Sequence, residues 1–251
     1  MKKLLLLLII PFLSFGQGWE QVYSEWQIGC SVKETSDGEY VISGTSNLSG
    51  PSANGNIVLL KINLFGDIIW SNTFTVGGIG YNVKETQDGG YIIVGVGSGI
   101  GGNDVKLVKT SSVGDTLWTK SLGGELDQVG YSIDQTDDGG YIISGNHVQS
   151  GILLLKTDSL GNVLWTKDLD GSIGYSVEKT VDNGYIIAGH IPENVYDALL
   201  IKTNQYGDTL WSQTFGGDDF DVVYSVQKTT DEGYVMCGFT KSFGSQDRDC
   251  L

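Results

Sequence analysis

The segment from Tyr81 to Trp118 reads YNVKETQDGGYIIVGVGSGIGGNDVKLVKTSSVGDTLW. It holds four runs of strand length, and the dipeptides Asp88-Gly89 and Gly114-Asp115 separate the first run from the second and the third from the fourth. Such dipeptides favour tight hairpin turns, because glycine and its acidic neighbour tolerate a positive φ. The segment therefore predicts four short antiparallel strands. No stretch has an apolar face at helical spacing, so we expect almost no helix.

The same pattern recurs along the chain. Copies of the first strand begin at Cys30, Tyr81, Tyr131, Tyr175 and Tyr224, so the repeat period is 44 to 51 residues. Four copies continue to a third strand that ends in lysine, at Lys61, Lys109, Lys156 and Lys202. Their fourth strands carry Trp70, Trp118, Trp165 and Trp211. A period of this length is typical of repeat folds whose unit is one small sheet.

The second and third strands of each unit carry apolar residues at both odd and even positions, as in Tyr91–Val94 and Leu199–Ile201. Both faces of each sheet must then be covered, whereas the sheets of a sandwich commonly keep one face in water. The coils of a parallel β-helix are shorter than this repeat. We therefore predict an all-β fold, a β-propeller of four-stranded antiparallel blades, with about five units and the last one truncated.

The two ends of the chain carry further information. Residues 1–16 combine Lys2 and Lys3 with a short apolar run and small residues, which is typical of a secretory signal peptide. That run is shorter than the roughly 20 residues that cross a bilayer, so we expect an exported protein with no membrane span. Residues 17–251 form the predicted propeller domain. Trp19–Tyr23 matches a fourth strand and predicts a lead-in strand, while Asp249–Leu251 matches only the start of a third strand, so the domain looks incomplete at its C-terminus.

The charge is strongly acidic, with 30 Asp and Glu against 15 Lys and Arg. Nucleic acid and anionic lipid are therefore not expected as partners. We expect no cofactor; Ca²⁺ held by acidic loops is an alternative that no ligand spacing supports. Three cysteines make no disulfide framework. Cys30 stands at a strand position where other units have Tyr, and Cys237 lies in an apolar second strand, so both are predicted to be small core residues; Cys250 is left unassigned.

Three motifs carry a family resemblance: Gly90–Gly95, Asp104–Thr110 and Gly114–Trp118. They resemble secreted β-propeller repeat proteins of Bacteroidetes, and the resemblance covers nearly all of the chain after residue 16. It implies delivery to the cell surface or medium, usually through a C-terminal sorting domain for type IX secretion, which this sequence lacks. Relatives bear names such as lectin-domain protein or endoglucanase, and the resemblance brings no catalytic residues with it.

Catalytic chemistry is poorly represented. The two histidines, His147 and His190, fall in connections at non-equivalent offsets, with no cysteine or acidic spacing that would make a zinc site. Most aspartates, such as Asp88 and Asp138, belong to turns in which the side chain bonds a backbone amide. The repeated tryptophans are expected to pack between blades rather than to serve as sugar platforms. The repeated lysines are expected to extend toward solvent at strand ends. We assign no catalytic residue and no metal ligand.

Geometry predicts where a site would lie. In an up-and-down unit, the turns within the first and second hairpins share one rim, here called the turn rim, which is short and uniform. The opposite rim, called the variable rim, carries connections of unequal length, where recognition usually occurs. The candidate binding residues there are Asn47, Ser49, Asn103, Glu125, Asp127, His147, His190, Glu193, Asp218, Asp219 and Asp221.

The function predicted from these features is a non-enzymatic binding or adhesion module, secreted or at the cell surface, lectin-like in recognising a glycan, or else a protein, on its variable rim. We expect it to be a monomer. Two alternatives stay open: a polysaccharide hydrolase that uses rim carboxylates, and a structural spacer with no specific ligand. A propeller fold by itself does not choose among them.

Overall fold

The computed structural model describes residues 20–23, 28–46, 55–192, 195–243 and 249–250. Within these residues, regular secondary structure consists of β-strands, and no helix is long and apolar enough to cross a membrane. In chain order the strands are β1 (Ile28–Glu34), β2 (Tyr40–Ser46), β3 (Asn56–Ile62), β4 (Ile68–Phe74), β5 (Ile79–Glu85), β6 (Tyr91–Ser98), β7 (Asn103–Thr110), β8 (Thr116–Leu122), β9 (Gln128–Gln135), β10 (Tyr141–His147), β11 (Gly151–Thr157), β12 (Val163–Leu169), β13 (Ile173–Lys179), β14 (Tyr185–Pro192), β15 (Tyr196–Thr203), β16 (Thr209–Phe215), β17 (Asp221–Lys228), β18 (Tyr234–Thr240) and β19 (Asp249–Cys250).

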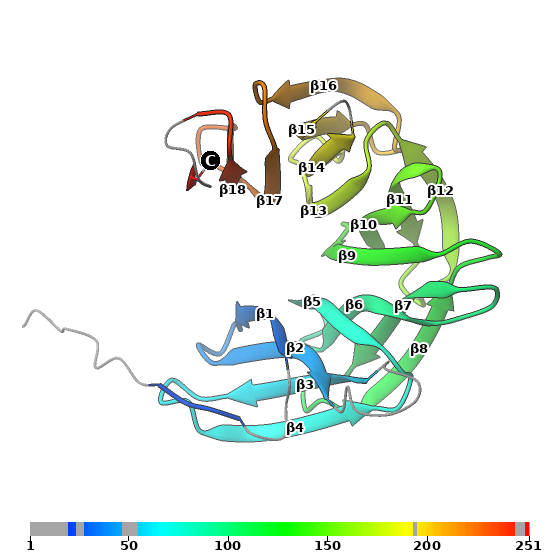
Figure 1. The fold of residues 1–251 in the computed structure, drawn as a ribbon. Coiled ribbons are helices and arrows are strands. Elements are labelled where there is room, and N and C mark those ends of the chain that lie inside the picture. The colour runs from blue at the N-terminus through cyan, green and yellow to red at the C-terminus, as the bar shows by residue number, and fades with distance from the viewer. Residues whose placement is uncertain (1–19, 24–27, 47–54, 193–194, 244–248, 251) are drawn as a thin grey trace, which may run out of the picture.

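The strands form five antiparallel sheets, numbered blades 1 to 5, in which neighbours in the chain are neighbours in the sheet. Blades 1 to 4 have four strands each, and the described part of blade 5 has three, β17 to β19. In Figure 1 the first strand of each blade lies toward the centre and the fourth at the outside, and the blades follow one another around an arc. The fold is a β-propeller, and the prediction of an all-β propeller is confirmed.

The middle strands of blades 2 to 4 are buried on both faces because each of these blades lies between two neighbours. In β10 of blade 3, Tyr141 and Ile143 pack in one cluster with Val94 of blade 2. The intervening Ile142 points the other way and packs with Val177 of blade 4. Successive side chains of a strand point to opposite faces, so a continuous apolar run fills both interfaces. Each such side chain contributes roughly 1.5–3 kcal/mol through burial.

The repeated tryptophans lie between blades, as the sequence predicts. Each ring of a fourth strand faces a tyrosine that begins the second strand of the next blade, and the pairs with their centroid distances are Trp70–Tyr91 at 5.8 Å, Trp118–Tyr141 at 6.1 Å, Trp165–Tyr185 at 6.2 Å and Trp211–Tyr234 at 6.4 Å. All four pairs are tilted, the geometry that aromatic rings favour.

Every first strand contains a β-bulge, which the sequence pattern did not predict. The register skips Cys30 in blade 1 and a tyrosine in the other blades, namely Tyr81, Tyr131, Tyr175 and Tyr224. A bulge leaves one residue unpaired and re-aims its side chain. The four tyrosine rings follow one another with centroid distances of 5.1, 5.4 and 5.0 Å, and they are here called the tyrosine column.

The hairpin turns adopt the positive φ that their sequences predict. In the turns between first and second strands, Gly38, Gly89 and Gly139 have φ between 76° and 79°. Blades 4 and 5 place Asn183 (φ 60°) and Glu232 (φ 68°) at the same position. A positive φ costs free energy in residues other than glycine, and this cost is smaller for asparagine than for glutamate.

The cysteine prediction is half wrong. Cys30 is partly buried, but Cys237 is exposed on β18. The equivalent position in blade 4, Ala188 on β14, is fully buried. The difference arises because blade 5 packs against blade 4 on one face, while within the described residues no further blade covers the other face. The three cysteines are all free thiols.

The predicted lead-in strand is not present in its described part, residues 20–23, and Trp19 lies outside the described residues. These four residues belong to none of the five described sheets. Tyr23 nevertheless donates a hydrogen bond from its hydroxyl to the carbonyl of Gly66 at 2.8 Å. Asn72 makes the same kind of contact with Gly114 of the next blade, at 3.0 Å. The segment therefore contacts blade 1 as a fourth strand contacts the following blade.

Candidate functional site

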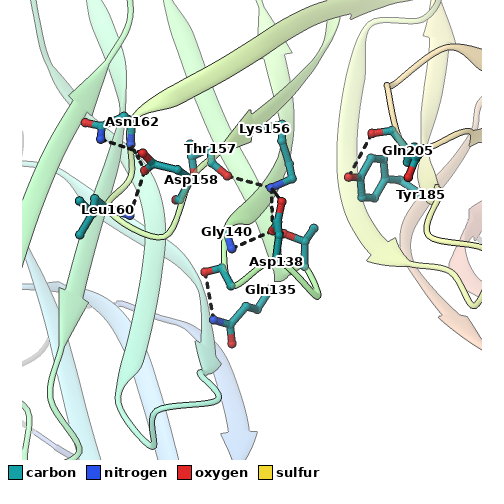
Figure 2. A network of polar contacts seen from close by, with 12 residues as sticks. Gln135, Asp138, Gly140, Lys156, Thr157, Asp158, Leu160, Asn162, Tyr185 and Gln205 are labelled. Atoms are coloured by element: carbon teal, nitrogen blue, oxygen red, sulfur yellow. Dashed lines mark hydrogen bonds and ion pairs between the residues drawn. The ribbon is translucent and has the colours of Figure 1, made fainter.

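The turn rim carries a lysine–aspartate clamp in each of blades 1 to 4. In blade 3, the ammonium of Lys156 donates to Asp138 Oδ2 at 2.9 Å and to the carbonyl of Thr157 at 2.9 Å (Figure 2). Asp138 also accepts from the Thr136 hydroxyl at 2.6 Å and from the Gly140 N–H at 2.9 Å. Burial opposes ionisation of Asp138, but these hydrogen bonds outweigh it and hold its pKa at about 2.

The clamp corrects one expectation and confirms another. The prediction that Lys61, Lys109, Lys156 and Lys202 extend to solvent is wrong, since their side chains are only 4–8% exposed. A turn aspartate lies close enough to each ammonium to compensate its charge, so the lysine can stay inside the blade. The predicted bonds from turn aspartates to backbone amides are confirmed at Asp88, which accepts from Gly90 at 3.0 Å, and at Asp138.

Two grooves of matching composition open on the turn rim beside these clamps. The groove between blades 2 and 3 has a volume of about 400 Å³ and is lined by Gln87, Asp88, Lys109, Leu117, Trp118, Gln135, Gly139, Tyr141, Ser159 and Leu160. The groove between blades 3 and 4 has a volume of about 470 Å³ and is lined by Thr136, Asp137, Asp138, Lys156, Leu164, Trp165, Lys179, Asn183, Tyr185, Gln205 and Tyr206. Figure 2 shows Tyr185 and Gln205 across the second groove from the clamp.

On the variable rim, the candidate residues fall into separate groups. Asn103, Glu125 and Asp127 meet beside blade 2, where the backbone N–H of Asn103 donates to Asp127 Oδ1 at 2.6 Å and the backbone of Glu125 lies against Gly101. His147 lies in blade 3, where its Nδ1 is 2.8 Å from Asp168 Oδ1. Asn47, Ser49 and Glu193 lie outside the described residues.

Asp218 and Asp219 lie in the connection between blades 4 and 5, and Asp221 is the first residue of β17. The three differ in environment. Asp218 and Asp219 are exposed, whereas Asp221 is fully buried. Asp221 Oδ2 accepts from the Gly217 N–H at 3.1 Å and from the Ser242 hydroxyl at 2.5 Å. Asp219 Oδ1 accepts from the N–H of Phe220 at 2.8 Å. Asp219 and Asp221 therefore shape the loop, whereas Asp218 makes no such contact with the described residues.

The same connection closes a pocket of about 310 Å³, here called the aromatic pocket, lined by Tyr175, His190, Tyr196, Phe220, Val222, Tyr224, Phe239 and Lys241. It belongs to blades 4 and 5, at the end of the tyrosine column. Its rings form a continuous series: the ring centroids of His190 and Tyr196 lie 4.6 Å apart, and those of Tyr196 and Phe220 lie 5.3 Å apart. The ammonium of Lys241 lies 5.4 Å from the centre of the Phe220 ring.

His190 is the most deeply buried polar group of the pocket, at 5% exposed. Its Nδ1 has no hydrogen-bond partner among the described residues. Burial lowers the pKa of His190 below its ordinary value of 6.5, so the ring is neutral at pH 7 and offers one donor and one acceptor. The pocket thus combines apolar ring faces with one buried polar group, the usual composition of a small-ligand site.

The sequence reasoning found only His190 of this pocket. A signal was nevertheless present: the position after the second-strand glycine is Thr45, Val96 and Asn146 in blades 1 to 3, but His190 and Phe239 in blades 4 and 5. The position four before the bulge residue is Gly77, Asp127 and Gly171 in blades 2 to 4, but it is aromatic in blades 1 and 5, where it is Trp26 and Phe220. Departures from the repeat, rather than the polarity of the loops, mark the site. Among the described residues, no three His, Cys, Asp or Glu side chains come together as metal ligands would.

Comparison with known proteins supports the fold and leaves the ligand open. No family model matches the chain, and no curated protein matches it either. Among solved structures, a protein of unknown function from Bacteroides caccae is 13% identical with a TM-score of 0.64, over 88% of this chain and 74% of that one. The Dos1 propeller (13%, TM-score 0.60) and the WD40 propeller domain of Doa1 (15%, TM-score 0.58) each match 84% of this chain, which spans 54% and 60% of their lengths. At these identities, the likeness shows that the chain has a β-propeller fold.

Proposed function

We propose that this chain is an exported binding module that holds a glycan in the aromatic pocket of its variable rim. The observation that carries the proposal is the convergence of six ring side chains on one open pocket. They come from β14, β15, β18, the connection between β16 and β17, and the tyrosine column. The repeat does not require these rings, because blades 2 and 3 keep the same strands and turns without a ring at the positions equivalent to His190, Tyr196 and Phe220.

The chemistry of the pocket suits a sugar ring. Phe220, Tyr196 and Tyr224 are 38%, 42% and 51% exposed, so their faces are available to the C–H groups of a pyranose. A ligand hydroxyl would satisfy the buried Nδ1 of His190, which otherwise carries a desolvation cost. Lys241 adds a donor at the rim of the pocket. Rings supply contact area and the two polar groups supply orientation.

The hydrolase alternative receives no support from this pocket. Glycoside hydrolysis commonly requires two carboxyl groups flanking the bond, about 5–10 Å apart. None of the eight lining residues carries a carboxylate. The neighbouring Asp221 is buried, and its Oδ2 is directed to Gly217 and Ser242 rather than into the pocket lining.

The test is a binding assay of the full exported chain against immobilised polysaccharides, with release of reducing ends measured in parallel. Phe220→Ala and Tyr196→Ala should each weaken binding about tenfold, the effect expected for one lost aromatic contact. Phe65→Ala is the matched control, since Phe65 is a 77% exposed ring on the turn rim of blade 1. Unchanged binding by both pocket variants would overturn the proposal, and release of reducing ends would favour the hydrolase.

A further inference from the structure

The turn rim holds an unexplained apolar feature. The tip of the turn between third and fourth strands is apolar in each of blades 1 to 4: Phe65, Val113, Leu160 and Tyr206, which are 60–77% exposed. Polar residues normally occupy such tips. The identity of the side chain varies from blade to blade while its apolar character is kept, so neither a turn requirement nor core packing accounts for it.

Two of these tips, Leu160 and Tyr206, line the two grooves of the turn rim. Leu117 and Leu160, 57% and 61% exposed, line the groove between blades 2 and 3. Leu164 and Tyr206, 56% and 63% exposed, hold the equivalent places between blades 3 and 4. Each groove also contains a partly buried tryptophan, Trp118 or Trp165, with a tyrosine beside it. Two neighbouring interfaces therefore present the same aromatic and aliphatic surface.

The charges in the grooves are paired within the protein. In the groove between blades 3 and 4, Lys156 pairs with Asp138 at 2.9 Å and Lys179 pairs with Asp137. In the groove between blades 2 and 3, Lys109 pairs with Asp88 at 3.0 Å. The aspartate side chains remain 58–63% exposed, so they can still accept hydrogen bonds from a ligand. Paired charges favour a ligand that is neutral and rich in hydroxyl groups over an ionic one.

We propose that the grooves between blades 2 and 3 and between blades 3 and 4 are equivalent subsites for a neutral polysaccharide. Each groove receives one sugar segment, with apolar faces against the tryptophan and the exposed leucine, and hydroxyl groups on the paired aspartate and the glutamine or asparagine nearby. Occupying both subsites by one polymer raises its apparent affinity, typically 10²- to 10⁴-fold over a single site, without any new contact. This inference concerns the rim opposite the aromatic pocket and does not depend on it.

The experiment compares the full chain with two paired variants, Leu117→Ser/Leu160→Ser and Leu164→Ser/Tyr206→Ser, and with their combination. The probes are β-glucan, mannan, xylan and galactan together with their pentasaccharides. All four substituted side chains are exposed, so folding should be retained, and circular dichroism checks this. Val181→Ser, an 82% exposed residue on the same rim but outside the grooves, is the matched control.

We expect each paired variant to bind the recognised polymer about a hundredfold more weakly than the parent, because only one groove remains. The intact groove should still bind the corresponding pentasaccharide. The combined variant should bind neither the polymer nor the pentasaccharide. The pentasaccharide should also change the tryptophan fluorescence of the Phe220→Ala variant, because Trp118 and Trp165 line the grooves. Polymer affinity that is unchanged in the combined variant, or that is lost only with Phe220→Ala, would overturn the inference. A normal fluorescence change on adding pentasaccharide to Phe220→Ala would support the groove subsites, even if the aromatic pocket binds no glycan.

Discussion

The rings of Tyr175 and Tyr224 lie 5.0 Å apart, edge to face, although 49 positions (224 − 175) separate them in the sequence. Both are bulge residues of first strands, so neither takes part in the register of its ladder. The same geometry that aligns the tyrosine column also turns its last two rings into the wall of the aromatic pocket.

Replacing Tyr175 should therefore affect ligand binding. Tyr175→Leu removes a ring that contacts both Tyr224 and His190, the latter at 5.7 Å, and we expect glycan binding to weaken about tenfold. Tyr81→Leu is the matched control, because Tyr81 belongs to the same column but does not line the pocket. Isothermal titration with a glycan that binds the parent checks this; an equal loss in both variants would mean that the column acts on stability alone.

The two partners of a clamp should be unequal in their effect on stability. Asp138→Ala leaves the buried ammonium of Lys156 without its carboxylate and should cost about 3 kcal/mol. Lys156→Met leaves Asp138 with a side chain 58% exposed, which water can solvate, and should cost about 1 kcal/mol. Urea unfolding of the two variants measures the difference. Equal losses would contradict the view that the lysine is the buried partner.

Acid should weaken the fold over a defined range. Hydrogen bonds from Lys61 to Asp37 and from Lys202 to Asp182 lower both pKa values to about 2, as at Asp138, from an ordinary 3.8. A lowered carboxyl pKa contributes stability above pH 3.8 that is lost as the pH falls toward 2. Melting temperatures should therefore drop steeply between pH 4 and 2, and Asp37→Asn/Asp138→Asn/Asp182→Asn should flatten that drop. An unchanged slope in the triple variant would place the acid sensitivity elsewhere.

A methyl group at Gly140 should be poorly tolerated. A Cβ there would lie 2.1 Å from the Thr157 carbonyl oxygen and 2.6 Å from Lys156 Nζ. Backbone would have to move and the clamp would loosen, so we expect Gly140→Ala to cost about 2 kcal/mol. Gly124→Ala is the control, since nothing lies within 4 Å of its added Cβ. Thermal unfolding compares them, and a harmless Gly140→Ala would show that the turn can shift freely.

Glycine at position 232 should stabilise blade 5. Glu232 has φ 68°, where blades 1 to 3 have glycine at the equivalent turn position. Relief of this conformation should give up to about 1 kcal/mol, after allowing for the larger entropy of glycine in the unfolded chain. Asn183→Gly should give less, because asparagine tolerates φ 60° better. Hydrogen exchange of β17 and β18 reports the gain locally, and no change in their protection would show that the turn carries no strain.

Much of the architecture was predictable because it rests on local patterns. Asp88-Gly89 and its counterparts predict the hairpins. The consecutive apolar residues Tyr91–Val94 predict sheets that are covered on both faces. The recurrence of Trp118 and its equivalents predicts rings between blades. These features depend on φ preferences, on the twofold alternation of strands and on side-chain volume, each of which can be read from a few neighbouring residues.

The site was harder to predict, because it depends on residues far apart in the chain. Asp219 and Asp221 looked like ligands from their charge, yet they hold loop backbone and Ser242 in place. Lys156 looked like a surface lysine, yet its ammonium is paired with Asp138, 18 positions (156 − 138) earlier. This ion pair offsets the free-energy cost of burying the lysine. Charge and polarity indicate what a side chain can bind, but not which partner lies beside it.

The sequence by itself determined the strands, the turns, the order of strands within each blade and the stacking of blades, since each follows from short-range geometry repeated every 44 to 51 residues. Only the tertiary structure decided where the bulges turn the tyrosines, which lysines are buried and which rings of blades 4 and 5 meet in one pocket. The physical reason is that a bulge, a buried ion pair and a pocket are each formed by contacts between strands or blades, whose free energy exists only once the blades are packed together.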